Sequence, residues 1–365
     1  MNLFKKNKPT KSIKKKSAIR EWINALSFAI ITATLIHWLI IEPSQVPTSS
    51  MEQTILAGDF ILVSKFHYGA RTPQTPLQLP LMHQTIRGTS IPSYLSWIQL
   101  PMYRLPGFSK VKRGDKVIFN CTTELDKPVD LRTYYIKRCI GLPGDTVYIE
   151  NGQVYINGEA QPQYTGLQHR YYLQTAEKLT DHFFDKYHIR EYMPVRDGYL
   201  VHINSQTADR LRQLDWVKSL EIIFSPKHFF NPSVYPYSIH LGWNEDHFGP
   251  ITIPAKGMTI TINQETLEKY QKIIILYDSN ENEEVYVEED KLWINGKEVT
   301  SYTFKQNYYF MMGDNRHHSD DSRFWGFLPE NHLVGKGIIT LFSTDAKKSG
   351  FSKIRWDRFF RSLSN

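Results

Sequence analysis

The chain has 365 residues, 41% hydrophobic and 22% charged, so it is long enough to bury a substantial core and to form more than one domain. Its net charge of +7 is confined to the amino end, because residues 1–20 hold eight basic side chains and no acidic one. The rest of the chain has 36 of the 44 basic residues against 37 acidic ones. The bulk of the protein is therefore not cationic, and we expect no nucleic-acid partner.

An apolar run of twenty residues without a formal charge occupies positions 22–41, between Glu21 and Glu42. A helix of this length rises roughly 30 Å, the thickness of the hydrocarbon core of a bilayer. Basic residues mark the cytoplasmic end of a membrane span. We therefore expect a basic cytoplasmic segment at 1–21, one transmembrane helix at 22–41, and the remaining residues on the outer side of the membrane.

A cleavable signal peptide is the alternative for the same run, with Thr48 and Ser50 as the small residues of a cleavage site. The run is longer than the apolar part of a typical signal peptide, and Pro43 and Pro47 follow it. These two features favour an uncleaved anchor.

Short apolar runs bordered by Gly-Asp pairs dominate the part of the chain after the anchor, as at Gly58-Asp59 and Gly114-Asp115. Strands separated by such turns, in a chain with 21 Tyr and 20 Phe, predict antiparallel pairing. We expect a mainly β fold preceded by one transmembrane helix. Its parts are an antiparallel β-domain formed by 42–145 and 308–346, and a long α+β insertion at 146–307.

The insertion contains an internal similarity. Residues 147–158 align with 285–296, and each copy predicts a hairpin whose second strand ends at Asn-Gly. Chance resemblance of two ordinary hairpins is the alternative. Helices are expected near 175–187 and 206–219, the second with Asn204-Ser205 as its cap. The insertion shows no catalytic pattern.

Two further segments combine apolar and polar character. Residues 70–109 contain six prolines, which exclude a central strand or an unbroken helix. This segment is either a loop packed on the core or a surface that enters the lipid headgroups. Residues 347–365 form a basic tail, which is either an interfacial helix or a solvated end. A helix there would align Trp356, Phe359, Phe360 and Leu363 in one stripe.

The chain has two cysteines, Cys121 and Cys139. Two residues are too few for a disulfide-rich scaffold, even in an oxidising compartment. Cys139 lies in an apolar strand pattern and is predicted to be a small buried side chain. We expect no structural disulfide.

One serine and one lysine have surroundings that suit catalysis. Ser50 follows the apolar run by nine residues, and a serine hydroxyl becomes nucleophilic only when a base removes its proton. A lysine serves as that base if burial lowers its pKa, and Lys137 lies among apolar residues in 134–142. Arg138, one residue further, is expected on the opposite face of the strand. Spacing alone favours the alternative, a linker serine and an exposed lysine on a strand edge.

A third segment, 313–323, concentrates polar side chains after the apolar run 308–312. Three alternatives remain open for it. The first is a metal site, although adjacent histidines lack the usual ligand spacing. The second is a Ser–His–Asp triad, although the chain has no Gly-x-Ser-x-Gly motif. The third is a turn held together by charged hydrogen bonds. The side chains concerned are His317, His318, Asp320 and Asp321.

Taken in order, five segments of this sequence resemble the conserved boxes of the bacterial type I signal peptidase (leader peptidase) family. They are PTSSM (47–51), GDFILVSKFHYG (58–69), VKRGDKVIF (111–119), YYIKRCIGLPGD (134–145) and YYFMMGDNRHHSDDSRFWGFLP (308–329). Each box alone is weak, but all five in order are highly specific. The resemblance implies a β catalytic domain that cleaves signal peptides from exported preproteins with a Ser/Lys dyad, which needs no metal or organic cofactor.

The resemblance also implies roles for individual residues. Ser50 would be the nucleophile and Lys137 the general base, while Thr48 would contribute its hydroxyl to the oxyanion hole. Ser319 would hold the lysine amine, and Asp321 with Arg323 would form a supporting ion pair. Pockets for small substrate residues at −1 and −3 would be lined by Val46, Met51, Ile61, Ile118, Tyr135 and Ile136.

The sequence departs from the family pattern at Ser49, where many members have Gly, and at Gln53, where many have Pro. His317 and His318 replace an Asp-Asn pair, and none of these changes removes a catalytic group. We expect a single-pass protein of the bacterial inner membrane, with its catalytic domain on the periplasmic side and with signal peptides and membrane lipid as partners. The alternatives are a self-cleaving Ser/Lys protease of the repressor type and a non-enzymatic anchored binding protein with the insertion as its recognition module.

Overall fold

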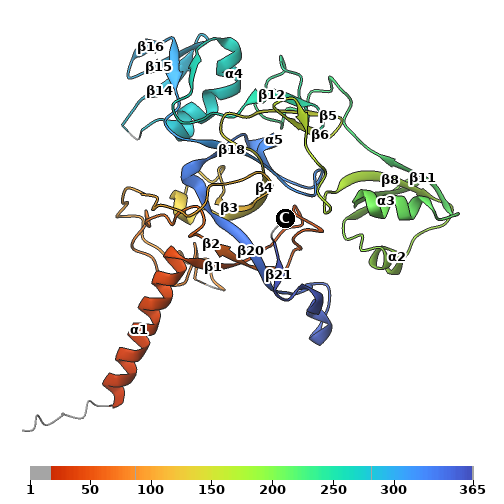
Figure 1. Cartoon of the computed structure of the whole chain (residues 1–365), viewed down its shortest axis with the longest axis horizontal. Coiled ribbons are helices and arrows are strands. Elements are labelled where there is room, and N and C mark those ends of the chain that lie inside the picture. The colour runs from red at the N-terminus through yellow and green to blue at the C-terminus, as the bar shows by residue number, and fades with distance from the viewer. Residues whose placement is uncertain (1–17, 87, 281, 364–365) are drawn as a thin grey trace, which may run out of the picture.

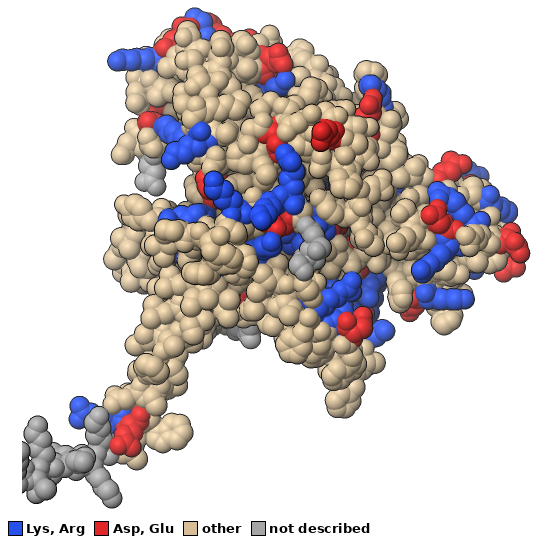
Figure 2. All heavy atoms as spheres, in the orientation of Figure 1, with Lys and Arg blue, Asp and Glu red and all other residues tan. Residues whose placement is uncertain are grey.

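The computed structural model describes residues 18–86, 88–280 and 282–363, so most of the expected basic segment 1–21 lies outside the described residues. The first element is the helix α1 (Ala18–Leu39), which extends from the body as a rod (Figure 1). None of its residues is buried, and it is long and apolar enough to cross a membrane. Figure 2 shows a rod surface without charged side chains between its free end and the body.

The helix differs slightly from the expected span of 22–41. It begins at Ala18 and ends at Leu39, because Ile41 already pairs with Ser64 in a strand ladder. The helix α1 and the first strand are therefore separated by Ile40 alone.

The central sheet has eight strands, and all its pairings are antiparallel, which confirms the predicted mainly β fold. The path runs β1-β2-β20-β3-β4-β18-β19, with β21 paired to β20. Its strands are β1 (Ile41–Gln45), β2 (Asp59–Ser64), β3 (Lys116–Asn120), β4 (Tyr134–Gly141), β18 (Tyr308–Met312), β19 (Leu328–Pro329), β20 (Leu333–Ser343) and β21 (Arg361–Ser362).

Both faces of this sheet are covered. Along β3, Ile118 packs into one apolar cluster while Val117 and Phe119 pack into another, because successive side chains of a strand point to opposite faces. All five residues of β3 and of β18 are buried. The short helical elements α5 (Ser322–Trp325), η1 (Val129–Leu131) and η3 (Glu330–His332) lie between its strands along the chain.

The predicted Gly-Asp turns share one geometry. Each glycine has a positive φ, which residues with a Cβ rarely adopt, and the aspartate that follows accepts a hydrogen bond from the backbone three residues earlier. The glycines are Gly58, Gly114 and Gly144, with φ of 91°, 88° and 88°, and the bonds join Leu56 N to Asp59, Lys112 N to Asp115 and Leu142 N to Asp145.

Part of the insertion shares a core with the central sheet. Val147 and Phe248 from the insertion pack in one cluster with Phe310 and Met312 of β18. The elements of this part are β5 (Thr146–Glu150), β6 (Gln153–Ile156), β7 (Glu159–Ala160), β12 (Phe248–Thr252), β13 (Thr259–Thr261), α4 (Gln264–Ile273), the π-helix η2 (Ile274–Asp278), β14 (Val285–Glu288), β15 (Lys291–Ile294), β16 (Lys297–Val299) and β17 (Ser301–Thr303).

Residues 169–222 form a separate lobe, which we call the side module (Figure 1). Its four-stranded antiparallel sheet carries two helices and has its own core, which includes Leu173, Phe184, Val201 and Leu211. The elements are β8 (His169–Thr175), α2 (Asp181–Lys186), β9 (Tyr192–Val195), β10 (Gly198–Ile203), α3 (Ser205–Arg212) and β11 (Val217–Ile222).

The two similar segments of the insertion are hairpins, as predicted. β5 pairs with β6, and β14 pairs with β15. In both, an Asn-Gly pair with positive φ, Asn157-Gly158 or Asn295-Gly296, turns the chain into a third strand.

The expected helices of the insertion are shorter than the pattern suggests. The first begins at Asp181, because 169–175 forms strand β8. The second starts where predicted, and the Asn204 side chain caps it by accepting a hydrogen bond from Thr207 N. It ends at Arg212 because residues 217–222 form β11.

In the described residues 347–363, the carboxyl tail forms no continuous helix, although most of these residues are exposed. It contains the 3₁₀ turns η4 (Gly350–Lys353) and η5 (Trp356–Arg358) and then joins the central sheet as β21. Leu363 is buried in the same cluster as Ile61, and Arg358 forms a buried ion pair with Asp59. These tertiary contacts prevent the helix that would align the apolar stripe.

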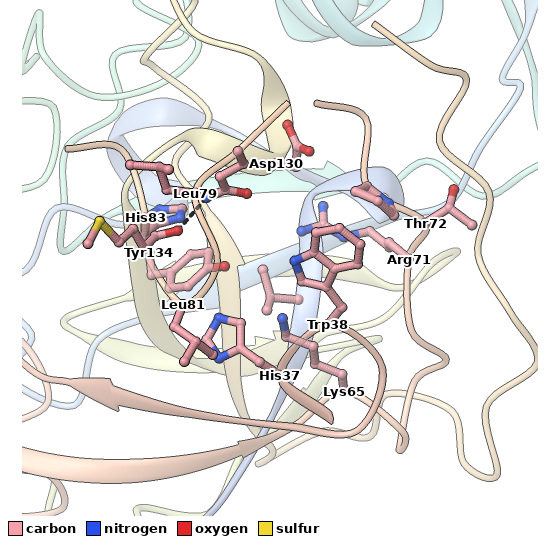
Figure 3. Close-up of a pocket in the computed structure, with 14 residues that line it drawn as sticks. His37, Trp38, Lys65, Arg71, Thr72, Leu79, Leu81, His83, Asp130 and Tyr134 are labelled. Atoms are coloured by element: carbon pink, nitrogen blue, oxygen red, sulfur yellow. Dashed lines mark hydrogen bonds between the residues drawn. The ribbon is translucent and has the colours of Figure 1, made fainter. Parts of the chain in front are cut away.

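The proline-rich segment is anchored at its base and apolar at its surface. Asp130 accepts hydrogen bonds from the amides of Gln74 and Thr75, whereas Trp97 is 82% exposed. A cavity of about 60 Å³ lies where this segment meets the carboxyl end of α1, lined by His37 and Trp38 among others (Figure 3). The segment is therefore packed on the core at its base and exposes apolar side chains, whereas its contact with lipid stays a prediction.

Candidate active site

Ser50 lies in the tight turn that follows β1. The turn is closed by hydrogen bonds from Glu52 N to Ser49 O (2.9 Å) and from Ile55 N to Met51 O (2.8 Å). Ser50 is 5% exposed, and Met51 beside it is fully buried. The residue is thus part of the packed core and not of a solvated linker.

Lys137 reaches the same point from β4. Its Nζ lies 2.7 Å from Ser50 Oγ, and the side chain is buried with the residue 4% exposed. The exposed lysine that spacing alone favours is therefore wrong. Among the described residues, no carboxylate oxygen lies within 4.0 Å of this amine.

Burial lowers the pKa of Lys137 below its ordinary value of 10.5, because the charged ammonium loses its hydration. The carboxylates of Asp321 and Asp320 raise it, but less than burial lowers it. A neutral amine has a lone pair that can accept the Ser50 hydroxyl proton at 2.7 Å. The arrangement is therefore chemically able to generate an alkoxide-like nucleophile.

Two other hydroxyls lie near the pair. Thr48 Oγ1 is 3.4 Å from Ser50 Oγ, at the outer limit of a hydrogen bond. Ser319 Oγ is buried and has no hydrogen-bond partner among the described residues. Both residues have been brought next to Ser50 by the fold, Thr48 through the same turn and Ser319 through Gly313.

Gly313 makes this approach possible, and sequence reasoning did not single it out. A Cβ at this position would lie 2.2 Å from Ser319 Oγ and 2.6 Å from the Ser50 carbonyl oxygen. Both distances are shorter than real Cβ contacts. The glycine before Asp314 in the fifth box was the available signal.

Asp321 and Arg323 form a buried bidentate ion pair, with Nε–Oδ1 and Nη2–Oδ2 distances of 2.9 Å. Asp321 also accepts from Gly313 N (3.0 Å) and caps α5. The pair therefore fixes the backbone beside Ser319. Because the pair is buried, removal of one partner would leave the other as an uncompensated buried charge and would strongly destabilise the fold.

A second buried ion pair was missed by the sequence analysis. Arg138 donates to both carboxylate oxygens of Asp314, over 2.7 and 2.6 Å, and to Gly114 O over 3.0 Å. Thr54 Oγ1 donates to the same carboxylate (2.6 Å). Strand alternation placed Arg138 opposite Lys137, but nothing local identified Asp314 as its partner.

The histidines of this segment have other partners. His317 Nε2 lies 3.0 Å from Asp246 Oδ1, and its Nδ1 accepts from Arg170 N, so the ring is engaged on both nitrogens away from Ser50. His318 is exposed. Within the described ranges, no three His, Cys, Asp or Glu side chains are grouped to hold a metal ion. The segment matches the third alternative, a turn of charged hydrogen bonds.

A known protein family matches most of this chain. The family model described as "Signal peptidase, peptidase S26" matches residues 19–209 and 249–342, well over half of the chain. The chain belongs to the signal peptidase family, peptidase S26. Members of this family are serine endopeptidases, so the chain is a hydrolase of peptide bonds.

Several curated relatives are similar to this signal peptidase family member. Signal peptidase I of Buchnera aphidicola subsp. Acyrthosiphon pisum is 28% identical over 316 residues, 86% of this chain and 72% of that protein. Signal peptidase I of Haemophilus influenzae is 23% identical over 352 residues, 95% and 76% of the two chains. Signal peptidase I of Rickettsia felis is 36% identical over 149 residues, which cover 40% of this chain and 46% of that protein.

Five of the six expected pocket residues of this signal peptidase family member come together. They pack in one apolar cluster with Ile55, Val63, Val334 and Leu363, and each is no more than 8% exposed. Tyr135 instead packs on the cluster that contains Val117 and Phe119, with its ring 5.4 Å from Lys137 Nζ. The reason is strand alternation in β4. The five are Val46, Met51, Ile61, Ile118 and Ile136.

The two cysteines are buried with free thiols. Cys139 packs in the cluster with Val117 and Met311, as a small apolar side chain does. Burial raises the pKa of its thiol well above the ordinary range, which keeps it protonated and unreactive.

Proposed function

We propose that this chain is a membrane-anchored endopeptidase that removes amino-terminal signal peptides from exported preproteins, with Ser50 and Lys137 as its catalytic dyad. The observation that carries the proposal is the 2.7 Å contact between Lys137 Nζ and Ser50 Oγ inside a desolvated site. The names of the relatives, all Signal peptidase I, support the substrate class.

The proposed reaction begins with proton transfer from Ser50 to neutral Lys137. Ser50 Oγ attacks the scissile carbonyl, and the Ser50 amide with the Thr48 hydroxyl stabilises the oxyanion. The lysine ammonium then protonates the departing amine, which becomes the new amino end of the mature protein. In the second half, Lys137 takes a proton from water, the hydroxide attacks the acyl carbonyl, and the lysine ammonium returns the proton to Ser50 Oγ as the signal peptide leaves.

Ser319 and the ion pair Asp321–Arg323 have supporting roles in this proposal. The unpartnered Ser319 hydroxyl is available to hold the lysine amine as it gains and loses its proton. The ion pair keeps Ser319 and Gly313 in place, since Asp321 bonds Gly313 N directly.

Substrate preference follows from the packing around Ser50. The cluster of Val46, Met51, Ile61, Ile118 and Ile136 is almost fully buried, so shallow depressions over it would admit only small side chains at −1 and −3. The substrate would bind as an extended strand with main-chain hydrogen bonds. Tyr135 would contribute beside the lysine and not in this cluster.

The membrane arrangement is part of the same proposal. α1 would span the inner membrane once, with the basic residues 1–21 in the cytoplasm and the β-domain, 42–145 with 308–346, on the periplasmic side. Residues 146–307 would form an inserted domain and 347–365 a basic tail. The exposed apolar side chains of 70–109 would contact lipid, among them Ile91, Leu95, Trp97, Ile98, Leu100 and Phe108. No nucleic acid takes part.

The test is cleavage of a purified preprotein by the full chain in detergent micelles. Ser50→Ala and Lys137→Ala should each abolish cleavage, whereas Lys110→Ala, an exposed lysine, should leave the rate unchanged. If either dyad variant still cuts at the same bond, the dyad assignment is wrong. If the wild type binds the preprotein without cutting it, a non-enzymatic role is correct.

Anchoring and orientation need their own experiment. A variant that lacks residues 1–40 keeps β1 and should leave the alkali-washed membrane fraction, in which the full chain should remain. The reporter Lys110→Cys should react with an impermeant thiol reagent on spheroplasts, because Cys121 and Cys139 are buried and stay silent. Labelling only after permeabilisation would reverse the proposed orientation.

A further inference from the structure

The turn that carries Ser50 is bonded to Asn315, a residue of the polar segment 313–323. Asn315 donates its backbone N–H to Ser50 O over 3.0 Å and its side-chain amide to Ser49 O over 3.4 Å. One residue therefore bonds the carbonyl of Ser50 through its backbone and the carbonyl of Ser49 through its side chain. Asn315 is itself completely buried.

The other end of the Asn315 amide is bonded to the side module. Its Oδ1 lies 2.8 Å from Nδ1 of His202, a residue of β10. Because the amide nitrogen faces Ser49 O, the oxygen faces the imidazole, and the ring must carry its proton on Nδ1. Burial lowers the pKa of His202, which favours the neutral imidazole over the charged one.

The backbone of the same segment is pinned to the insertion as well. Gln168 N donates to Asp314 O (2.8 Å), and Arg316 N donates to Gln168 O (3.0 Å). The Gln168 side chain in turn donates to His202 O (3.2 Å). Asn315 and Gln168 therefore form an isolated parallel β-bridge, and Gln168 directly precedes β8.

A second contact reaches the turn on the other side of Ser50. Arg190, which lies between α2 and β9, has its Nε 3.2 Å from Glu52 Oε1. Gln53 donates from Nε2 to His188 O over 3.4 Å. Glu52 is 3% exposed, and burial raises the pKa of its carboxyl to about 7, although the nearby Arg190 lowers it. The nucleophile turn is thus bracketed by contacts to residues 188–202.

We propose that the side module positions the nucleophile, with His202 acting through Asn315 as a positioning residue for Ser50. His202 does not touch the reacting atoms and is not a catalytic residue. The inference rests on the proposed role of Ser50. A reacting oxygen displaced by about 1 Å loses about 10²-fold in rate, so a bond that orients the Ser50 backbone acts on the chemical step. The insertion, which shows no catalytic pattern, therefore has a role in catalysis.

The experiment compares three replacements of His202 in the full chain. His202→Asn keeps an amide nitrogen at the same number of bonds from Cα as Nδ1, and should retain kcat within about twofold. His202→Gln keeps a polar side chain but places its nitrogen one bond further, and His202→Leu removes the donor. Both should lower kcat about tenfold or more with little change in KM. His182→Leu, an exposed histidine of α2, is the matched control and should change neither constant.

Three outcomes decide the matter. Equal kcat for all three His202 variants would overturn the proposal, and so would a loss in His202→Gln that appears in KM alone. Loss in His202→Asn as large as in His202→Leu would also overturn it, because the bond would not be the cause. Thermal unfolding of each variant separates misfolding from misplacement, since His202→Gln should unfold within a few degrees of the wild type.

A double-mutant cycle completes the test. If His202 acts through Asn315, the variant His202→Leu/Asn315→Ala should be no slower than Asn315→Ala alone. Additive losses in kcat would show that the two residues act separately. Loss of cleavage in Ser50→Ala with unchanged kcat in His202→Leu would leave the proposed function intact and refute the positioning role alone.

Discussion

Lys137 and Arg138 are neighbours on one strand, and both are buried basic side chains, yet they meet different kinds of partner. Arg138 faces the carboxylate of Asp314 and bonds both of its oxygens. Lys137 faces the hydroxyl of Ser50, and no carboxylate oxygen of the described residues lies within 4.0 Å of it. Two consecutive positions of β4 thus hold one basic side chain with a carboxylate partner and one without.

The difference teaches how this fold separates support from chemistry. A buried cation with a bidentate carboxylate keeps its charge and holds two segments together. A buried lysine without such a partner loses its proton more easily, which is what a general base requires. Arginine suits the first position because it stays protonated, and lysine suits the second because its pKa responds to burial.

The largest effect on catalysis is expected when the lysine at position 137 is replaced by an arginine. Lys137→Arg keeps a long basic side chain, but its guanidinium stays protonated and cannot accept a proton, so kcat should fall at least about 10³-fold, as in Lys137→Ala. The measurement is preprotein cleavage under single-turnover conditions. Substantial activity in Lys137→Arg would show that the cation stabilises charge and does not act as the base.

The next effect concerns stability. Arg138→Met leaves Asp314 as a buried, largely uncompensated charge and should lower the free energy of unfolding by about 3–5 kcal/mol. Arg113→Met is the matched control, because Arg113 makes a similar bond to Asp145 but its side chain is 39% exposed, and it should cost about 0–1 kcal/mol. Equal losses in denaturant titrations of the two variants would contradict the assignment of Arg138 as a structural cation.

The pH dependence of activity distinguishes Lys137 from Arg138 in another way. Burial holds the pKa of Lys137 below 10.5, and only its neutral form acts as the base. Log kcat/KM should therefore fall by about one unit per pH unit as the pH drops below the folded-state pKa. The same shift makes folding stability rise with pH between the folded-state and unfolded-state pKa values, because the unfolded chain binds the extra proton there. A flat activity profile down to acid pH would count against Lys137.

The smallest effect is expected at Ser319, the proposed partner of the Lys137 amine. Ser319→Ala should leave stability within about 0.5 kcal/mol but lower kcat about threefold to tenfold, because among the described residues its hydroxyl has no hydrogen-bond partner other than the proposed lysine amine. Ser322→Ala should do the reverse. Its Oγ accepts from the buried Met311 N over 2.8 Å, and leaving this N–H unpaired costs about 1–3 kcal/mol. Unchanged kcat in Ser319→Ala would remove Ser319 from the site.

Local patterns in the sequence predicted much of the central sheet. The Gly-Asp turns, the strands that follow them and the cap at Asn204 depend on residues a few positions apart, so they could be recognised without the fold. The helix ends were less accessible. β8 and β11 displaced the ends of α2 and α3, because pairing with another strand overrides helix propensity.

The candidate site divides in the same way. Ser50 and Lys137 were found through the ordered boxes, although spacing alone favoured an exposed lysine. Their contact joins residues 87 positions apart, and the bond from Asn315 to Ser49 joins residues 266 apart. No local rule reports whether such pairs meet.

The sequence by itself determined the chemistry that is available: an apolar run for α1, a serine and a lysine in recognisable boxes, and strands with alternating faces. The tertiary structure decided which groups meet. It buried Lys137 beside Ser50, gave Arg138 its carboxylate, brought His202 of the side module to Asn315, and drew the tail into the sheet as β21. The physical reason is that pKa shifts, ion pairs and strand partners depend on burial and on distant neighbours, which exist only once the whole chain has packed.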